Sequence, residues 1–319
     1  MHPVHPPITI ALATYRGAEF LQTQLDSIAA QSDANWRLLV SDDGSDDATT
    51  EIAQAFIAQN DGRGAVIDGP RKGSTRNFLS LVRAVPADGW MAFADQDDRW
   101  LPDKLARAAD YLRAQKGPAV YAARTTICDG ELNVITPAPA FPGPFTFRNA
   151  LIQACLPGNT IVVNAEALAL LKEAAPAAEA AGIISHDWWV YQVLSGAGAA
   201  IMRDRAQVLL YRQHPRNLMG RNDTARAKAA RFSMLTDGTF RLWLEANQRA
   251  LEPVAHLFAP ENRDLLRDFG MALQKPGPLA LRDFSRMKLY RQSRMGTLAV
   301  YGAALLGRLR SRNLAEQAG

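Results

Sequence analysis

Apolar runs and helical periodicities alternate along the first part of the chain. Four short runs rich in strand-forming side chains predict buried strands at residues 8–13, 36–40, 65–67 and 90–94. Between them, apolar residues recur at three- and four-residue spacing, which predicts amphipathic helices over residues 20–31, 49–58 and 77–85. Such alternation is typical of an α/β fold with a parallel, doubly wound sheet.

The pattern is less regular further along the chain. The expected elements there are a helix over 102–115, a strand over 119–123, a proline-rich irregular loop over 136–144, a strand over 161–164, a helix over 165–173, an alanine-rich linker or frayed helix over 174–182, a helix over about 186–196, and strands over 199–202 and 207–212. Residues 224–273 have a helical pattern, and the chain has no internal repeat.

An acidic motif, Asp95-Gln96-Asp97-Asp98, follows the apolar run at 90–94. Because that run predicts a buried strand, the carboxylates are expected at its carboxyl end, the edge where open α/β sheets bind ligands. An Asp-x-Asp pair suits a hard divalent cation, whose coordination a diphosphate can complete. The alternative is a solvated acidic turn that caps the next helix.

A second acidic cluster, from Ser41 to Asp47, follows the run at 36–40. Aspartate and glycine are ordinary turn residues, so one acidic strand end carries little information. Two such ends that converge on one crevice are more informative, because crowded carboxylates repel one another unless a cation or the donors of a ligand neutralise them. The pattern therefore favours a site for a metal ion and a polar ligand.

Composition and charge exclude several classes of protein. Only Cys128 and Cys155 occur, without metal-ligand spacing, so neither a disulfide framework nor a zinc site is expected. No signal peptide or membrane-spanning run is evident, so the expected location is the cytoplasm. The net charge is +4, yet residues 281–313 alone hold eight Arg and Lys against one acid. The basic surplus therefore belongs to the tail, which favours an anionic surface as a partner.

Six short motifs occur in order between residues 8 and 220. They are Ala13-Thr14-Tyr15, Ser41-Asp42-Asp43-Gly44-Ser45, Arg71-Lys72-Gly73 with Asn77, Ala94-Asp95-Gln96-Asp97-Asp98, His186-Asp187-Trp188-Trp189 and Tyr211-Arg212-Gln213-His214. In this order they resemble the inverting glycosyltransferases of family 2, and within that family the bacterial rhamnosyltransferase-type enzymes of surface-polysaccharide assembly.

The resemblance implies an α/β protein of the GT-A fold, with a Rossmann-like nucleotide-binding half and a mixed, mainly parallel central sheet. It implies a transferase domain over residues 1–220, in which 1–125 bind the nucleotide sugar and 126–220 bind the acceptor and carry catalysis. Residues 221–319 would form a helical C-terminal region.

The same resemblance places the nucleotide in the first half. Ala13, Thr14 and Tyr15 would line its pocket. Asp43 would accept the ring N–H of the base, a single-acceptor interaction that suits uracil or thymine. The alternative is that Asp43 only caps the helix that follows.

Later residues of that half would complete the donor site. Gly73 would let the backbone approach the nucleotide, and Asn77 would help to hold that loop. Asp95 and Gln96 would contact the ribose or the sugar. Asp97 would ligate Mg²⁺ or Mn²⁺ bound to the diphosphate.

Two features leave the metal ligands open. His214 resembles the downstream histidine that adds a ligand in many relatives, but it precedes a proline and is alternatively a surface loop residue. Gln96 and the additional Asp98 depart from the family pattern, so the carboxylates that touch the metal are not settled by the motif. Asp97 is the first candidate.

Asp187 is the candidate catalytic base. Inverting sugar transfer needs a group that takes the proton of the acceptor hydroxyl as it attacks the anomeric carbon. Asp187 stands at the family's position for this role, at a predicted helix start beside His186; its alternative role is an N-cap. A metal on Asp97 would neutralise the leaving diphosphate. Of Trp188 and Trp189, one is expected in the core and the other, with His186, against the acceptor or sugar.

The basic tail predicts contact with an anionic membrane. Its Arg and Lys residues flank an apolar patch at 298–306, which is too short to span a bilayer but suits the interface. The alternative is a terminal helix packed on the body. Nucleic acid is not an expected partner, because no recognition motif accompanies the charge.

The sequence thus predicts a metal-dependent glycosyltransferase that moves L-rhamnose from dTDP-L-rhamnose to a growing glycan or lipid-linked acceptor, in O-antigen or capsule biosynthesis at the inner face of the plasma membrane. A UDP-sugar donor and a catalytically silent nucleotide- or membrane-binding scaffold are the alternatives. A sugar-nucleotidyltransferase would need a Gly-rich basic loop after the first strand, and a nicotinamide dehydrogenase would need G-x-G-x-x-G; neither is present.

Overall fold

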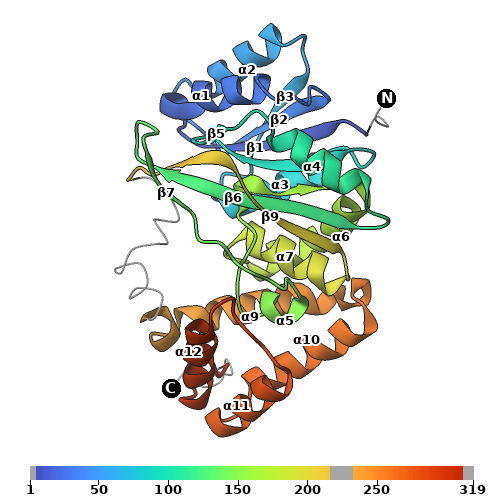
Figure 1. The fold of residues 1–319 in the computed structure, drawn as a ribbon, viewed down its shortest axis with the longest axis vertical. Coiled ribbons are helices and arrows are strands. Elements are labelled where there is room, and N and C mark those ends of the chain that lie inside the picture. The colour runs from blue at the N-terminus through green and yellow to red at the C-terminus, as the bar shows by residue number, and fades with distance from the viewer. Residues whose placement is uncertain (1–4, 216–232, 312–319) are drawn as a thin grey trace. The chain divides into compact units, whose positions relative to one another are not determined.

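The computed structural model describes residues 5–215 and 233–311 (Figure 1). The chain divides into two compact units. The first comprises Met1–Ala140, Leu156–Ala175 and Ala199–Arg221, and the second comprises Phe141–Cys155, Pro176–Gly198 and Asn222–Gly319. This division differs from the domains expected on either side of residue 220, because two segments from the middle of the chain group with the C-terminal helices.

The first unit contains a nine-stranded sheet in the order β3-β2-β1-β4-β8-β6-β9-β5, with β7 pairing β6. The strands are β1 (Ile8–Thr14), β2 (Trp36–Asp42), β3 (Gly64–Asp68), β4 (Trp90–Asp95), β5 (Arg99–Trp100), β6 (Ala119–Cys128), β7 (Val134–Pro137), β8 (Val162–Val163) and β9 (Ala200–Arg212). The long ladders β1–β2, β1–β4, β2–β3 and β6–β9 are parallel, and the short ladders of β5, β7 and β8 are antiparallel. The sheet is therefore mixed and mainly parallel, as expected.

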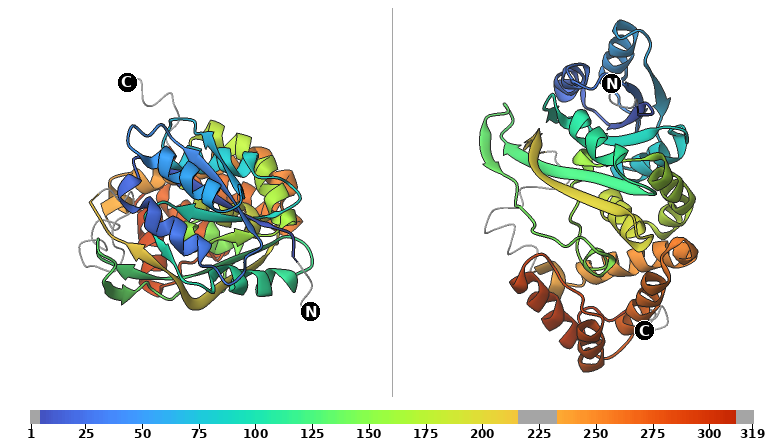
Figure 2. Two further views of the ribbon diagram at one scale, coloured as in Figure 1. Left: turned by 90° about the horizontal axis from the view of Figure 1, so that it is seen from above. Right: turned by 45° about the vertical axis from the view of Figure 1, so that its right-hand side comes forward.

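Helices pack against this sheet (Figure 2), and its central strands β1 and β4 are buried. They are α1 (Ala18–Ala29), α2 (Thr49–Gln59), α3 (Ser74–Ala84), α4 (Lys104–Arg113) and the first part of α6 (Ala165–Ala181); a short 3₁₀ helix, η1 (Gly158–Thr160), precedes β8. Every residue of β1 is buried, which explains why this strand is a continuous apolar run without alternation. The β1, β2 and β4 strands run side by side, so their carboxyl ends meet at one edge.

The second unit is helical. It contains α5 (Phe147–Ala150), α7 (His186–Gly196), α9 (Thr239–Leu251), the 3₁₀ helix η2 (Glu252–Leu257), α10 (Pro260–Leu273), α11 (Gly277–Arg286) and α12 (Arg294–Leu305). Aromatic contacts join these elements, among them Phe269 with Phe284 at 5.7 Å and Phe284 with Tyr301 at 6.5 Å between ring centroids. Across 5–215 and 233–311, no helix has the length and apolar content that a membrane span requires.

One long strand, β9, replaces the two short strands expected at 199–202 and 207–212. The charged residues between them interrupt the apolar pattern, yet they remain in the strand, where Asp204 has three hydrogen-bond donors. Asp204 accepts hydrogen bonds from both Nε and NH2 of Arg107, at 3.0 and 2.8 Å, and from the hydroxyl of Tyr121 at 2.9 Å. A hydropathy pattern cannot predict such a partly buried ion pair between residues far apart in the sequence.

Three further expectations differ from the structure. The segment at 174–182, expected as linker or frayed helix, is the second part of α6, which continues through Pro176. The loop at 136–144 begins inside β7, which pairs with β6. The two-residue strand β5 was not expected, because its residues follow directly on the acidic motif. The part of the helical pattern at 224–232 lies outside the described residues.

Candidate active site

Both acidic clusters lie at the carboxyl edge of the sheet in the first unit. In the parallel ladders, Thr14 on β1 pairs with Asp42 on β2, and Ala13 pairs with Asp95 on β4. The topology therefore brings the two acidic strand ends to either side of the β1 terminus, as their positions after parallel strands predict.

The carboxylate of Asp42 stabilises the turn that follows β2. Its carboxylate accepts hydrogen bonds from the hydroxyl of Thr14 at 2.9 Å, from the backbone N–H groups of Gly44 and Ser45 at 3.1 and 2.7 Å, and from the hydroxyl of Ser45 at 2.6 Å. Thr14, predicted to line the nucleotide pocket, is buried and uses its hydroxyl to hold this turn. Its contribution to a pocket would therefore be one of shape.

Asp43 holds the loop that leads into α3. Its two carboxylate oxygens accept the backbone N–H groups of Gly73, at 2.7 Å, and Lys72, at 3.3 Å. Gly73 has a φ of +88°, a conformation that favours glycine. Asn77, one turn into α3, donates to the backbone oxygen of Ser41 at 2.8 Å and so ties the same helix to β2.

Backbone N–H groups therefore offset much of the negative charge of the second acidic cluster. From the sequence alone, a cation or the donors of a ligand were expected to neutralise this charge. A carboxylate has about four acceptor positions, and Asp43 uses two of them on the loop. The remaining lone pairs leave it able to accept a further N–H group, such as that of a nucleotide base.

Gln96 clamps the loop between β1 and α1. Its side-chain amide accepts the backbone N–H of Tyr15 and donates to the backbone oxygen of the same residue, both at 2.9 Å. The Tyr15 side chain is about half exposed, beside Arg16, whose guanidinium carbon lies 5.3 Å from the ring centroid. Gln96 thus fixes the backbone of Tyr15 just beyond the end of β1, while the Tyr15 side chain remains exposed to solvent.

Gly17 makes room for this clamp. A Cβ atom on Gly17 would lie 2.1 Å from Oε1 of Gln96, so Gly17→Ala is expected to displace the amide and destabilise the protein by about 1–2 kcal/mol, the net value of two hydrogen bonds. Gln96→Ala should cost a similar amount. In the Gln96→Ala background, Gly17→Ala should cost little, because the obstructing amide is gone. Urea unfolding of the four proteins measures this coupling, and additive losses would contradict the clamp.

Asp97 meets His214, a residue 117 positions away in the sequence. Oδ2 of Asp97 lies 2.7 Å from Nε2 of His214, and both side chains are largely buried. The imidazole packs on Phe20 of α1, with ring centroids 4.7 Å apart. Arg212, two residues before the histidine, donates from Nε to the backbone oxygen of Asp97 at 2.9 Å. The end of β9 is therefore fastened to the acidic turn at two points.

Asp98 is fully buried under this turn, in contrast to Asp97. It accepts a hydrogen bond from Asn159 at 2.7 Å, and its other oxygen has no partner among the described residues. Burial raises the pKa of Asp98 well above its ordinary value, and the charges of Asp97 and Asp95 act in the same direction. We therefore interpret Asp98 as a packing residue of the turn and Asp97 as the carboxylate that faces a ligand.

Lys104 is a second buried ionisable group below the acidic motif. Its ammonium lies 3.0 Å from the centroid of the Trp100 ring, a cation–π contact. Burial lowers the pKa of Lys104 well below its ordinary value, while the charges of Asp98 and Asp95 oppose this change. The sequence pattern did not distinguish this lysine from the other basic residues of a surface helix.

A buried polar stripe, formed by Gln24 and Ser27 of α1 and by Gln31 two residues after its end, positions the chain after the acidic motif. Ser27 accepts the backbone N–H of Trp100 at 3.0 Å, and Gln31 both donates to and accepts from the backbone of the next residues, at 2.8 and 3.0 Å. The amide of Gln24, oriented by its partners, contacts the backbone oxygen of Asp98 at 2.7 Å. The polar side chains of Gln24, Ser27 and Gln31, at positions where apolar residues would be expected, were the sequence signal for this support.

The Asp97–His214 pair fits a divalent cation. A carboxylate oxygen and an imidazole nitrogen are common ligands of Mn²⁺, and neighbouring ligands of an octahedral ion lie about 3 Å apart, so the pair at 2.7 Å needs to open only slightly. Within 5–215 and 233–311, no group of three or more His, Cys, Asp or Glu side chains is placed to hold a metal. The protein would thus supply part of the coordination, and the oxygens of a diphosphate and water would supply the rest.

Asp187 lies in the second unit, in the first turn of α7. The N-cap of that helix is Ser185, so the N-cap role considered as the alternative for Asp187 is filled by Ser185. Oδ1 of Asp187 accepts the hydroxyl of Ser185 and the backbone N–H of Trp188, the latter at 2.7 Å. Burial lowers the pKa of His186 to about 4, although Asp187 opposes the change, so His186 is neutral at pH 7.

Trp188 and Trp189 are both buried. Trp188 stacks on Phe240 at 6.0 Å between ring centroids and donates from its indole nitrogen to the backbone oxygen of Ala150 at 2.7 Å. The expectation that one of the two rings faces a sugar is wrong for this structure, because neither ring is exposed. Adjacent positions on α7 are both buried since other helices of the unit cover more than one side of it.

Comparison with known proteins establishes the family. The family model described as glycosyl transferase family 2 matches residues 9–174, more than half of the chain. The chain belongs to glycosyl transferase family 2. It is therefore a glycosyltransferase, and the matched range contains the β1, β2 and β4 strand ends described above.

One curated relative covers most of the chain. The dTDP-rhamnosyl transferase RfbG of Shigella flexneri is 29% identical over 238 residues, which is 72% of this chain and 81% of that protein. This similarity covers a larger part of the chain than the residues that the family model matches.

Two solved structures show the same fold at low sequence identity. Staphylococcus aureus TarS in complex with UDP-GlcNAc has a TM-score of 0.54 and 16% identity, with 95% of this chain and 89% of that chain covered. The mannosyltransferase PcManGT of Pyrobaculum calidifontis, in complex with GDP-Man and Mn²⁺, has a TM-score of 0.51 and 15% identity, with 96% and 86% covered. The GT-A fold expected from the sequence is confirmed.

Proposed function

We propose that this transferase moves L-rhamnose from dTDP-L-rhamnose, with inversion, to a growing glycan or a polyprenyl-linked acceptor in bacterial surface-polysaccharide biosynthesis, as in O-antigen or capsule assembly. The observation that carries the proposal is the Asp97–His214 pair at the edge where Asp43 also lies. The similarity to RfbG supports the sugar and the nucleotide. A UDP-sugar donor is the alternative, since TarS was solved with UDP-GlcNAc.

In the proposed donor site, the residues of the first unit bind and orient the nucleotide. Asp43 accepts the ring N–H of the base through a lone pair that the Gly73 loop leaves unused. The backbone of Ala13 and the exposed ring of Tyr15 flank the nucleotide, and Asp95 hydrogen-bonds the ribose or sugar. Gln96 acts indirectly here, because its amide is engaged with the backbone of Tyr15.

Asp97 and His214 would hold Mg²⁺ or Mn²⁺ against the diphosphate. When bound, the cation supplies Lewis-acid stabilisation of the charge that develops on the leaving diphosphate. Because the leaving group is then stabilised without a proton, the chain needs only one carboxylate for proton transfer. We assign that role to Asp187, whose carboxylate takes the proton of the acceptor hydroxyl as the new glycosidic bond forms.

The acceptor and the location follow from the same proposal. A lipid-linked acceptor is present at the inner face of the plasma membrane, so a peripheral position on that face would bring enzyme and acceptor together. The basic C-terminal region would provide this contact with anionic lipids. We propose no nucleic-acid partner.

Calorimetric titration of dTDP, UDP and GDP, first with Mn²⁺ and then with EDTA, tests the donor site. We expect Mn²⁺-dependent binding of dTDP and weaker binding of UDP, in line with the similarity to RfbG. GDP should bind most weakly, because its larger purine base would have to fit a site proposed for a pyrimidine. Preference for UDP would select the alternative donor. If none of the three nucleotides binds, the proposed donor site is wrong.

A further inference from the structure

Helix α12 in the second unit has two apolar faces. One face is buried through Val300, Ala303 and Ala304. The opposite face carries Met295, Leu298 and Leu305, which recur at helical spacing and are 74%, 61% and 45% exposed; Leu306 follows directly and is 70% exposed. Single exposed apolar residues are ordinary, but a continuous stripe of this kind marks a binding surface.

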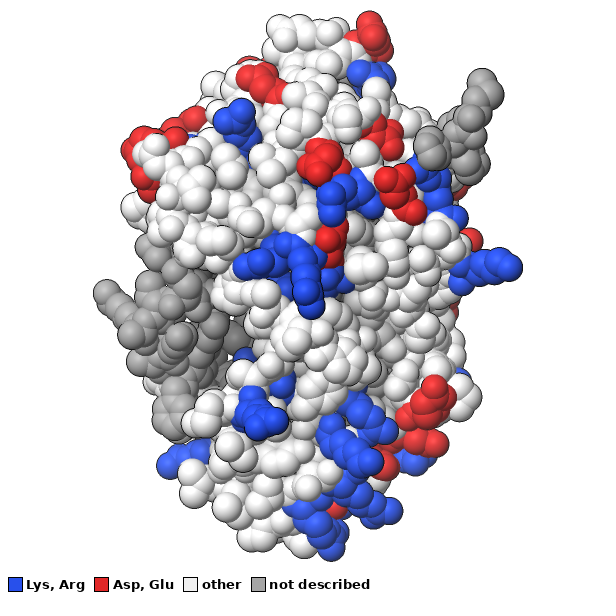
Figure 3. All heavy atoms as spheres, in the orientation of Figure 1, with Lys and Arg blue, Asp and Glu red and all other residues white. Residues whose placement is uncertain are grey.

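Only positive charge accompanies this stripe. From Phe284 to Ser311 the sequence contains no acidic residue and six basic ones: Arg286, Lys288, Arg291, Arg294, Arg308 and Arg310. Figure 3 shows Lys and Arg side chains gathered over the region of α11 and its neighbours. An apolar stripe whose flanking sequence is basic complements the surface of an anionic membrane.

The length of α12 limits how it meets a membrane. Its 12 residues extend about 18 Å at 1.5 Å per residue, well short of the roughly 30 Å of a hydrocarbon core. The helix therefore suits a position parallel to the interface, with its leucines in the upper acyl region and its arginines at the level of the phosphates.

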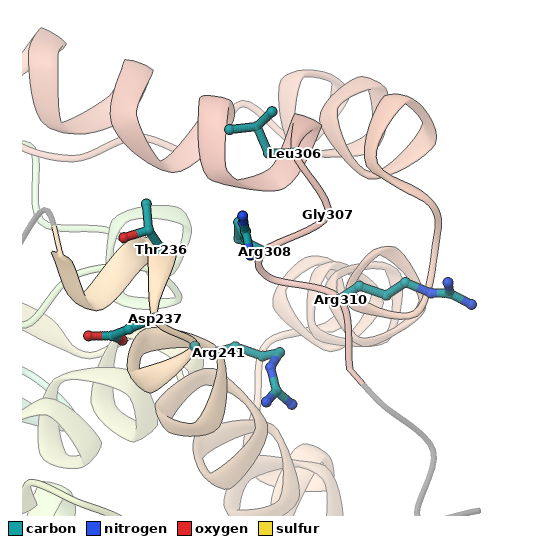
Figure 4. A pocket seen from close by; sticks show the side chains of 8 residues that line it. Thr236, Asp237, Arg241, Leu306, Gly307, Arg308 and Arg310 are labelled. Carbon is teal, nitrogen blue, oxygen red and sulfur yellow. The ribbon is translucent and has the colours of Figure 1, made fainter. Parts of the chain in front are cut away.

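A pocket lies at the end of this stripe. It has a volume of about 360 Å³ and is lined by Thr236, Asp237, Gly238, Arg241, Leu306, Gly307, Arg308 and Arg310. Figure 4 shows Arg308 projecting between Thr236 and the end of α12, with the guanidinium of Arg241 below it and Arg310 extending outward. The Asp237 carboxylate is engaged with the backbone N–H of Thr239 at 2.8 Å.

The charges of this pocket favour an anion. Arg241 is paired through its NH1 nitrogen with Glu245 at 3.0 Å. Among the residues that the structure describes, Arg308 forms no ion pair. A guanidinium presents several N–H groups in a plane, an arrangement that matches phosphate oxygens.

We propose that this pocket binds the phosphate of a membrane lipid, with Arg308 and Arg241 as its ligands, while Leu298, Leu305 and Leu306 enter the acyl layer beside it. The inference rests on the membrane contact included in the proposed function, and it gives that contact a specific site. Leu306 and Arg308 are two residues apart, so one end of α12 meets both the acyl chains and the phosphate of one lipid molecule.

Sedimentation with vesicles tests the site. The full-length protein is mixed with vesicles of phosphatidylcholine alone or of equal parts phosphatidylcholine and phosphatidylglycerol. We expect Arg308→Glu to weaken binding to the mixed vesicles roughly 10- to 30-fold, since it reverses one charge at the surface. Leu306→Ser should weaken binding to the mixed vesicles as well. Met271→Ser and Arg249→Glu, on exposed positions of α10 and α9 that neither belong to the stripe nor line the pocket, should bind as the unchanged protein does.

A matched charge reversal separates the pocket from general attraction. Arg286 is exposed on α11, within the same basic region, but it does not line the pocket. Arg286→Glu should cost clearly less binding than Arg308→Glu. Equal losses would show that the membrane responds to total charge only and would overturn the pocket as a lipid site.

Two further outcomes would also overturn the proposal. If inorganic phosphate or diphosphate at low millimolar concentration binds the free protein and Arg308→Glu abolishes it without changing vesicle binding, the pocket serves a soluble phosphate. If Leu306→Ser alters only the oligomeric state measured by light scattering, a second copy of the chain covers the stripe. Absence of vesicle binding by the unchanged protein, with dTDP binding intact, would reject the membrane contact and leave the transferase proposal standing.

Discussion

Asp187→Asn is expected to lower the turnover number roughly 10²–10⁴-fold, the usual contribution of a general base, while dTDP binds as before. Asparagine has nearly the same shape, and its oxygen can still accept the N–H of Trp188 and the hydroxyl of Ser185, so α7 should keep its first turn. The amide cannot take a proton from the acceptor hydroxyl at neutral pH. Only the chemical step should therefore be affected.

The measurement pairs steady-state transfer with calorimetry of dTDP. Asp264→Asn, which removes an exposed carboxylate of α10 that pairs with Arg267, is the matched control and should retain full turnover. Loss of dTDP binding in Asp187→Asn, in proportion to the loss of turnover, would contradict the base assignment and indicate a role in binding.

Asp97→Ala is expected to remove the Mn²⁺-dependent part of nucleotide binding and to lower turnover by about 10³-fold or more, because Lewis-acid stabilisation of a leaving diphosphate amounts to several kcal/mol. The backbone oxygen of Asp97 accepts the bond from Arg212, and this contact survives the substitution. The turn should therefore remain folded while one ligand is lost.

Titration of dTDP with Mn²⁺ and with EDTA distinguishes the outcomes. Asp97→Ala should bind dTDP equally in both, at the level of the unchanged protein in EDTA. Asp110→Ala, which removes an exposed carboxylate of α4, should retain the response to Mn²⁺. A full Mn²⁺ response in Asp97→Ala would exclude this residue as a ligand.

Most of the secondary structure of the first unit could be predicted from the sequence. A continuous apolar run such as β1 is typical of a parallel strand that is buried on both faces, so its place inside the sheet followed from the pattern. Five of the six motifs lie in the first unit at or beside the carboxyl edge of the sheet, where Asp43 contacts Gly73 and Asp97 contacts His214; the motif around Asp187 lies in the second unit. The pairing of Asp97 with His214 came from family resemblance alone, since nothing local in the sequence joins two residues so far apart.

Other features of the site could not be derived from sequence. Asp97 and Asp98 are identical neighbours, and only packing against Asn159 distinguishes the buried carboxylate from the other. The polar stripe of α1 has the composition of a solvent-facing stripe, and its role depends on which segment lies against it. Likewise, the burial of Trp188 depends on α9, a helix that comes later in the chain, through contacts with Phe240 and Trp243.

The contact between His214 and Asp97 also has a consequence for the order of events during synthesis. The acidic turn leaves the ribosome long before the histidine that completes the pair, and α1 must already be folded to hold the turn. Closing so long a loop is entropically costly and is expected late in folding. A nascent or truncated chain that ends before β9 would therefore lack the proposed metal pair, and we expect it not to cleave the sugar nucleotide before the rest of the enzyme exists.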